Sequence, residues 1–194
     1  MTSTQTSGRQ CILDQARHLF FARGYHGVSV RDIVQACGLS NAALYHHFGS
    51  KDALFIEVFK GHIAQIIQQL REAGKTEGSC RERLFSMSES YGRIMLESQS
   101  ELQALRRDLM ECDPDERQRL LFDAQWQVPS LFAAVLEEAI AAGEIQTVDT
   151  DRIGMLLTGM IFSLTVRRRF EAADETLSDD IELVIDTLFE GIGN

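Results

Sequence analysis

Residues 38–54, GLSNAALYHHFGSKDAL, gather side chains that can bind a metal ion or a polyanion. The adjacent histidines His46 and His47 raise the metal interpretation first. Neighbouring residues on a helix point about 100° apart, whereas metal-binding helices place two histidines at i and i+4 on one face. No further side chain nearby is spaced to complete a ligand set with these two. We therefore predict no metal and no cofactor here, and consider contacts to nucleic acid instead.

Two short helices separated by a glycine turn explain the spacing in this part of the chain. The first begins at Ser29, with Asp32 as the acidic partner of a capping box, and stops at Gly38. Ser40 caps the second, which has about two turns and ends near Phe48. These dimensions predict a helix-turn-helix, in which the second helix enters the major groove of DNA.

The two faces of the second helix separate core residues from contact residues. Leu44 and Phe48 lie four apart and can pack inward, which leaves Asn41 and Tyr45 on the outer face. An asparagine can pair bidentately with adenine, and the small Ala42 allows close approach to thymine methyl groups. Tyrosine, histidine and lysine can donate to phosphates, and an arginine suits a phosphate or a guanine. The predicted DNA-binding residues are Arg31, Ser40, Asn41, Ala42, Tyr45, His46, His47 and Lys51.

The charge distribution is compatible with DNA binding although the net charge of the chain is −10. Residues 1–51 carry five basic and two acidic side chains, a net charge of +3, which leaves −13 on the remainder. A small basic head on an acidic body can bind a polyanion through the head alone. Two alternatives stay open: the polar side chains only solvate a small helical domain, or the same head binds a protein.

Helical periodicity runs through almost every segment and predicts an all-α fold of about nine helices. We expect a flexible tail over 1–8 and a helix-turn-helix DNA-binding domain over 9–51. A connecting helix over 51–73 should join it to an effector-binding and dimerisation domain over 74–194. Pro129 should kink the longest helix of that second domain. Its expected helices lie near 80–98, 101–112, 114–142, 150–171 and 178–191.

The cysteine pattern and the start of the chain favour a cytoplasmic protein with no membrane partner. No apolar run reaches the roughly 20 residues that a membrane span needs, and the start, MTSTQTSGRQ, lacks the apolar core of a secretory signal. Four cysteines without the spacing of a zinc site suit reduced, packed thiols. Whether Cys112 or another cysteine senses redox state stays open. The four are Cys11, Cys37, Cys80 and Cys112.

Residues 29–55, SVRDIVQACGLSNAALYHHFGSKDALF, resemble the DNA-binding signature of tetracycline-repressor-type (TetR/AcrR) transcriptional regulators. The resemblance is specific over about residues 10–60, and beyond residue 75 it extends only to the layout of the helices. Ala42 stands where a glycine is common in the family. The resemblance implies a homodimer that binds a palindromic operator. The family's DNA contacts fall on Arg31, Asn41, Ala42, Tyr45, His46, His47 and Lys51.

Apolar stripes on the last two helices predict a dimer interface. One reading helix buries too little surface for specific affinity, so two copies across a two-fold axis are expected. Gly154 and Gly159 would permit close approach of the helices. The alternative is that the stripes belong to the core of a single chain. The stripe residues are Ile153, Leu156, Leu157, Met160, Ile161, Leu164, Leu177, Ile181, Val184, Ile185 and Leu188.

Methionine and aromatic side chains on the middle helices suit an adaptable apolar cavity, although core packing uses the same residue types. We expect this cavity to bind a small, hydrophobic or amphipathic effector. Arg93, Arg106 and Arg107 can meet an acidic group of such a ligand, although solvated surface explains them equally well. The predicted pocket residues are Met87, Tyr91, Met95, Phe122, Trp126, Met155 and Phe162.

Enzyme signatures are missing from the sequence. There is no phosphate-binding glycine loop, GxSxG, HExxH or CxxC motif, so we predict no catalytic residue. The favoured interpretation is a transcriptional repressor that a small molecule releases from a palindromic operator. Activation and co-repression stay open, as do the identity of the effector and the operator sequence.

Overall fold

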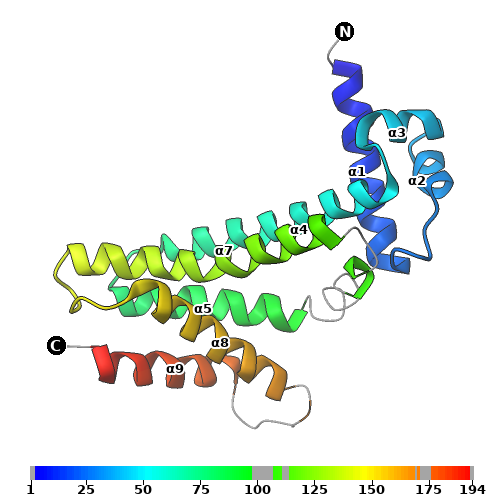
Figure 1. Cartoon of the computed structure of the whole chain (residues 1–194). Helices are drawn as coiled ribbons and strands as arrows, with labels where there is room; N and C mark the ends of the chain where they lie inside the picture. The colour runs from blue at the N-terminus through cyan, green and yellow to red at the C-terminus, as the bar shows by residue number, and fades with distance from the viewer. Residues whose placement is uncertain (1–2, 98–106, 111–113, 169, 171–175, 193–194) are drawn as a thin grey trace. The chain divides into compact units, whose positions relative to one another are not determined.

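The computed structural model describes residues 3–97, 107–110, 114–168, 170 and 176–192 (Figure 1). Every regular element within these ranges is a helix, which confirms the predicted all-α class. The chain divides into two compact units, Met1–Ile63 with Ser100–Leu121, and Ala64–Gln99 with Phe122–Asn194. The helices are α1 (Ser3–Arg23), α2 (Val30–Ala36), α3 (Asn41–Phe48), α4 (Lys51–Gly74), α5 (Cys80–Glu97), α7 (Pro114–Ala141), α8 (Thr150–Arg167) and α9 (Leu177–Ile192).

Helix boundaries in the first unit fall where local side-chain chemistry predicts them. The Ser29 hydroxyl accepts from the Asp32 amide at 3.2 Å, and the Asp32 carboxylate accepts from the Ser29 amide at 2.8 Å, which completes the capping box of α2. Hydrogen bonds from the Ser29 hydroxyl and amide lower the pKa of the Asp32 carboxyl. Gly24 and Gly38, with φ of 71° and 64°, follow α1 and α2 in the left-handed conformation that glycine adopts without strain.

The core of the first unit forms where α1, α2 and α3 pack against one another. α1 packs against α2 and α3, and α2 packs against α3. Phe20 on α1 meets Phe55 on α4 edge to face, with ring centroids 5.1 Å apart, and both side chains are fully buried. Leu109, from the segment 107–110, is also fully buried in this core. The structure groups this segment with the unit that contains α1, α2 and α3. The predicted domain boundary at residue 74 stays a prediction.

Helix α1 begins at Ser3, inside the segment 1–8 that the sequence predicted as a flexible tail. The core contacts of Ile12, Ala16 and Phe20 anchor the later turns of α1. Residues 3–8 contain no proline, and a single glycine costs a helix only about 1 kcal/mol. The helix can therefore propagate backward from its anchored turns, because extension is easier than nucleation.

The second unit packs α5 against both α8 and α9, and α8 against α9 (Figure 1). Its core contains side chains of α5, α7, α8 and α9, including the fully buried Leu84, Phe132, Leu157 and Ile181. Gly154 on α8 lies against α7, because a Cβ added there would stand 2.4 Å from the Pro129 carbonyl oxygen. The close approach that Gly154 permits is therefore within one chain.

Most side chains of the apolar stripes predicted as a dimer interface are buried or partly buried in this core. A dimer interface on these two helices stays a prediction. α5 packs against both α8 and α9, and the buried stripe side chains lie in the core of this unit. Only Leu156 of the stripe is largely exposed, at 59%. Ile153, Met160, Leu164 and Leu177 are partly buried against the core. The buried members are Leu157, Ile161, Ile181, Val184, Ile185 and Leu188.

Candidate nucleic-acid interface

The turn between α2 and α3 is fixed by backbone and side-chain hydrogen bonds. The Leu39 amide donates to the Val34 carbonyl at 2.8 Å, and the Ser40 hydroxyl accepts from the Ala43 amide at 3.3 Å. Ser40 thereby caps α3 as predicted, although its hydroxyl is also exposed to solvent. The two helices are thus held in a defined orientation before any ligand binds.

One face of α3 is buried and the opposite face is exposed, as the sequence predicted. Leu44 is fully buried and Phe48 is 9% exposed, while Tyr45 is 52% exposed. Asn41, Ala42 and His46 are exposed as well. The amide, methyl, hydroxyl and imidazole groups of this face are accessible to base edges. That they touch DNA remains a prediction.

His47 lies at the edge of the exposed face, beside α1. It is half-buried, and its ring stands edge-on to His46, with centroids 5.3 Å apart. Its Nε2 atom would lie 3.8 Å from a Cβ at Gly8 on α1. This position suits a phosphate contact at the rim of a groove better than a contact to a base edge.

Two predicted cationic contacts differ in their surroundings. Arg31 is exposed on the first turn of α2. Lys51, at the start of α4, instead donates from Nζ to the Tyr25 carbonyl at 2.6 Å and stands 3.8 Å from the centroid of the Tyr25 ring. The lysine is therefore held at the corner between α1 and α2, with its ammonium fixed in direction rather than extended freely into solvent.

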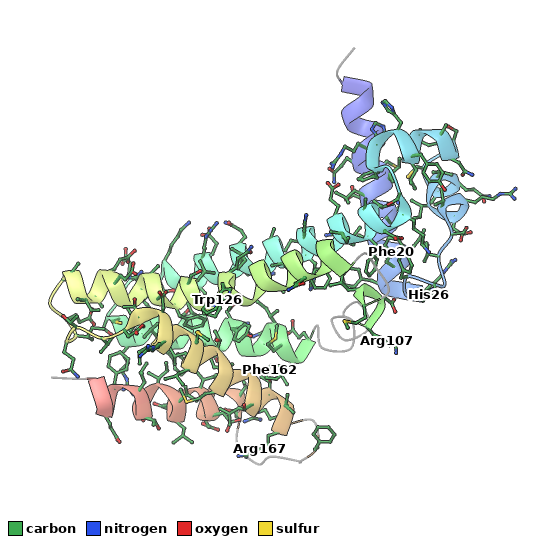
Figure 2. All side chains as sticks on the ribbon, viewed as in Figure 1. Phe20, His26, Arg107, Trp126, Phe162 and Arg167 are labelled. Atoms are coloured by element: carbon green, nitrogen blue, oxygen red, sulfur yellow. The ribbon has the colours of Figure 1, made fainter. Side chains whose placement is uncertain are left out.

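Tyr25 and Asp108 are residues that sequence reasoning missed. The Tyr25 amide donates to Oδ2 of Asp108 at 2.6 Å, and the Tyr25 hydroxyl donates to Asp52 on α4. Tyr25 and Asp108 are 83 positions apart, and no periodic pattern links the two segments. Gly24 allows the approach, since a Cβ there would stand 3.0 Å from Oδ2 of Asp108. Phe20, His26 and Arg107, which mark this region, are labelled in Figure 2.

The predicted effector-pocket residues are only partly brought together. Met87 on α5 is fully buried against Gly74, and Tyr91 meets Phe132 of α7 edge to face at 6.4 Å. Trp126 and Phe162, labelled in Figure 2, are 42% and 46% exposed, and that they line a pocket with Met87 stays a prediction. Met155 is 40% exposed and Met95 is half-buried. The Phe122 side chain lies outside the described part of the chain.

The arginines and cysteines that the sequence offered as ligand-binding or redox groups lie in the following surroundings. Arg93 faces Glu89 at 3.9 Å and Arg107 faces Asp108 at 3.7 Å, while Arg106 and Cys112 fall outside the described residues. Burial raises the pKa of the Cys80 thiol to about 11 and that of the Cys37 thiol to about 12, which makes both poor nucleophiles. Within the described ranges, no three His, Cys, Asp or Glu side chains gather as a metal site would require.

None of the described helices combines the length and apolar composition needed to cross a membrane.

Comparison with known proteins identifies the family. Residues 12–58 match the model of bacterial regulatory proteins of the tetR family, and residues 77–166 match the tetracyclin repressor-like C-terminal domain. The HTH-type transcriptional repressor KstR2 of Rhodococcus jostii is 27% identical over 146 residues, which cover 75% of this chain and 72% of KstR2. The HTH-type transcriptional activator FasR of Mycolicibacterium smegmatis is 32% identical over 80 residues, 41% of this chain and 36% of FasR.

A solved structure shows the same fold over the full length. The crystal structure of a putative TetR-family transcriptional regulator from Mesorhizobium loti covers 100% of both chains with a TM-score of 0.82, at 19% sequence identity. At this identity the likeness shows the fold alone, and the family is shown by the two matched models, over residues 12–58 and 77–166. The chain belongs to the TetR family of transcriptional regulators.

Proposed function

We propose that this chain is a ligand-responsive repressor that binds a palindromic operator as a homodimer and is released by a small, largely apolar effector. The observation that carries the proposal is the two-sided α3, whose Leu44 and Phe48 are buried while Asn41 and Tyr45 are exposed. The similarity to the repressor KstR2 covers more of the chain than the similarity to the activator FasR, which favours repression.

Each exposed residue has a role set by its chemistry. Asn41 reads an adenine edge, and Ala42 packs on a thymine methyl group. Tyr45, His46 and His47 donate hydrogen bonds to the phosphates or base edges within their reach, and Arg31 binds a phosphate or a guanine.

Residues 9–51 form the DNA-binding domain, 51–73 connect it, and 74–194 bind the effector and form the dimer. The protein works in the cytoplasm, where its DNA is, and has no catalytic residue.

The dimer forms through a surface stripe that differs from the stripe predicted from sequence. Met155, Leu156, Gly159 and Phe162 recur at helical spacing on α8 and are exposed, and Leu183 of the neighbouring α9 is 62% exposed. Nothing lies within 4 Å of a Cβ added at Gly159, so a partner helix can approach there closely. An apolar stripe of this kind on two adjacent helices fits a two-fold four-helix interface.

The effector occupies the apolar region around α5. Tyr91 and Met95 are half-buried beside the core residue Met87, and methionine and aromatic side chains adapt to apolar ligands of varied shape. Isothermal titration of the dimer with a panel of acyl chains, sterols and aromatic drugs should give saturable heat for at least one class. Binding that also shifts operator affinity supports the role, and heat from no member of the panel contradicts it.

Selection of bound sequences from random duplex DNA tests the whole proposal. We expect an enriched palindrome whose half-site centres are one helical turn, about 34–36 Å, apart or a multiple of that distance. Affinity for this duplex should fall steeply between 50 and 200 mM salt, because phosphate contacts release counterions. A protein-binding head would enrich no sequence and would show no such salt dependence.

A further inference from the structure

Tyr25, in the turn between α1 and α2, makes hydrogen bonds to two side chains through its backbone amide and carbonyl groups. On one side, the carboxylate of Asp108 accepts from the Tyr25 amide at 2.6 Å. On the other, the ammonium of Lys51 donates to the Tyr25 carbonyl at 2.6 Å. The Tyr25 ring completes the arrangement, since it packs on Phe20 and Phe55 and receives the lysine at 3.8 Å from its centroid. A shift of Tyr25 therefore moves the anchor of the lysine.

Asp108 is itself buried. Its side chain is 8% exposed, and its neighbour Leu109 is fully buried in the core of the same unit. A hydrogen bond to a buried charged acceptor is about twice as strong as one between neutral groups, and its loss leaves a buried carboxylate poorly solvated. The segment 107–110 is therefore part of the folded head, although it lies in sequence between α5 and α7, most of which belong to the other unit.

The direction of the lysine ammonium matters for phosphate binding. The hydrogen bond from the Lys51 ammonium to the Tyr25 carbonyl fixes where the positive charge of this side chain lies. Lys51 is the first residue of α4, where the helix amides also favour an anion. An oriented ammonium contributes more to phosphate affinity than a mobile one, because less side-chain entropy is lost on binding.

We propose that Asp108 is a positioning residue for operator binding, which acts through Tyr25 to orient the Lys51 ammonium toward a DNA phosphate. This inference rests on the proposed function, because it requires that the chain bind an operator. It adds a residue from outside the helix-turn-helix to the machinery of that motif.

A double-mutant cycle on the full-length protein tests the coupling. The dissociation constant for the duplex selected by the wild type is measured for Asp108→Ala, Lys51→Ala and the double variant. We expect each single change to weaken binding about five- to tenfold. The double variant should bind at least threefold more tightly than the product of the two single effects predicts. A deviation below threefold overturns the proposal, since independent sites combine to within about twofold.

The salt dependence separates positioning from general loss of structure. Removal of one phosphate contact lowers the slope of log affinity against log salt by about 1 per subunit. We expect Asp108→Ala to lower the slope toward that of Lys51→Ala, because the ammonium is no longer aimed at the phosphate. A slope equal to that of the wild type, with affinity reduced, would assign Asp108 a structural role only and overturn the proposal.

A matched control and a conservative variant test whether the effect of Asp108→Ala comes from its bond to the Tyr25 amide. Glu144 accepts from the Cys80 amide at 2.6 Å and is thus a similar carboxylate-to-backbone contact in the other unit. Glu144→Ala combined with Lys51→Ala should be additive, and a coupling equal to that of Asp108 would overturn the assignment to Tyr25. Asp108→Asn keeps an acceptor oxygen for the Tyr25 amide, so it should retain more of the operator affinity and of the salt slope than Asp108→Ala. An equal loss in the two variants would assign the effect to the charge of Asp108 rather than to its bond with Tyr25, and would overturn the proposal. Steep salt-dependent binding by the wild type would leave the proposed function intact even if the cycle is additive.

Discussion

Asn41→Ala is expected to lower affinity for the selected operator by about 1–3 kcal/mol per half-site, and by about twice that for a dimer on a palindrome. Asn41 is the first residue of α3 and is exposed, so its amide group can reach a base edge without rearrangement of the head. A bidentate contact between asparagine and adenine supplies both affinity and discrimination. The loss should therefore be confined to the operator and relax the preference at one base position of each half-site.

The measurement compares fluorescence anisotropy on the operator, on operators altered at single positions and on a scrambled duplex. Because a base contact releases no counterion, the salt slope of Asn41→Ala should equal that of the wild type. Tyr45→Phe, which removes a phosphate-reaching hydroxyl, should instead weaken all duplexes by a similar factor. Gln69→Ala, at an exposed position of α4, serves as the control and should change nothing. A uniform loss for Asn41→Ala would contradict base recognition by this residue.

The local features of the head could be predicted because they depend on residues close in sequence. The capping box of Ser29 with Asp32 and the cap at Ser40 are set by side chains three positions from their partners. The inward direction of Leu44 and Phe48 follows from a four-residue spacing on one helix. Because Leu44 and Phe48 point inward, the remaining side chains of this helix must face outward, and the candidate DNA contacts could therefore be predicted from the sequence.

The contacts that sequence reasoning missed are those made over long separations. Nothing in the residues around Asp108 indicates that its carboxylate accepts from the Tyr25 amide, because that bond depends on how the chain returns to the head. The same limit applies to Lys51. Its position at the start of the fourth helix suggested a phosphate contact, but nothing in the sequence indicated that its ammonium donates to the Tyr25 carbonyl. Periodicity predicts which residues share a face, but it cannot identify what covers that face.

Helix α8 shows this limit most clearly, because two of its faces are apolar. Leu157 and Ile161 are fully buried, whereas Leu156 and Phe162 are exposed, and all four are large hydrophobic side chains. The face that packs within the chain is decided by α5, which contacts α8 and α9. The sequence predicted an interface on both helices, with the core of a single chain as the alternative, because periodicity alone does not separate the two. The exposed face is the one that remains for a second copy.

Leu156→Glu should convert the proposed dimer into monomers at micromolar concentration. The side chain is 59% exposed in a single chain, so glutamate is tolerated there while the chain is alone. In the proposed interface the carboxylate would be buried beside its two-fold copy, and an unpaired buried charge costs several kcal/mol. Sedimentation equilibrium should report a mass near 21.8 kDa for the variant and twice that for the wild type.

Operator binding should fall with the dimer. Two linked heads gain about 10²- to 10⁴-fold over one head when both half-sites are engaged, and this gain is lost in a monomer. Phe170→Glu is the matched control, because Phe170 is 82% exposed and lies beyond the end of α8. It should leave both mass and operator affinity unchanged.

A core variant of the same helix separates the two faces. Leu157→Ala should lower the free energy of unfolding by about 2–5 kcal/mol, because a fully buried leucine leaves a cavity. The folded fraction should nevertheless remain dimeric, since Leu157 does not reach the exposed stripe. If Leu157→Ala dissociates the folded dimer while Leu156→Glu does not, the interface lies on the face that the sequence first indicated, and the assignment made from exposure is wrong.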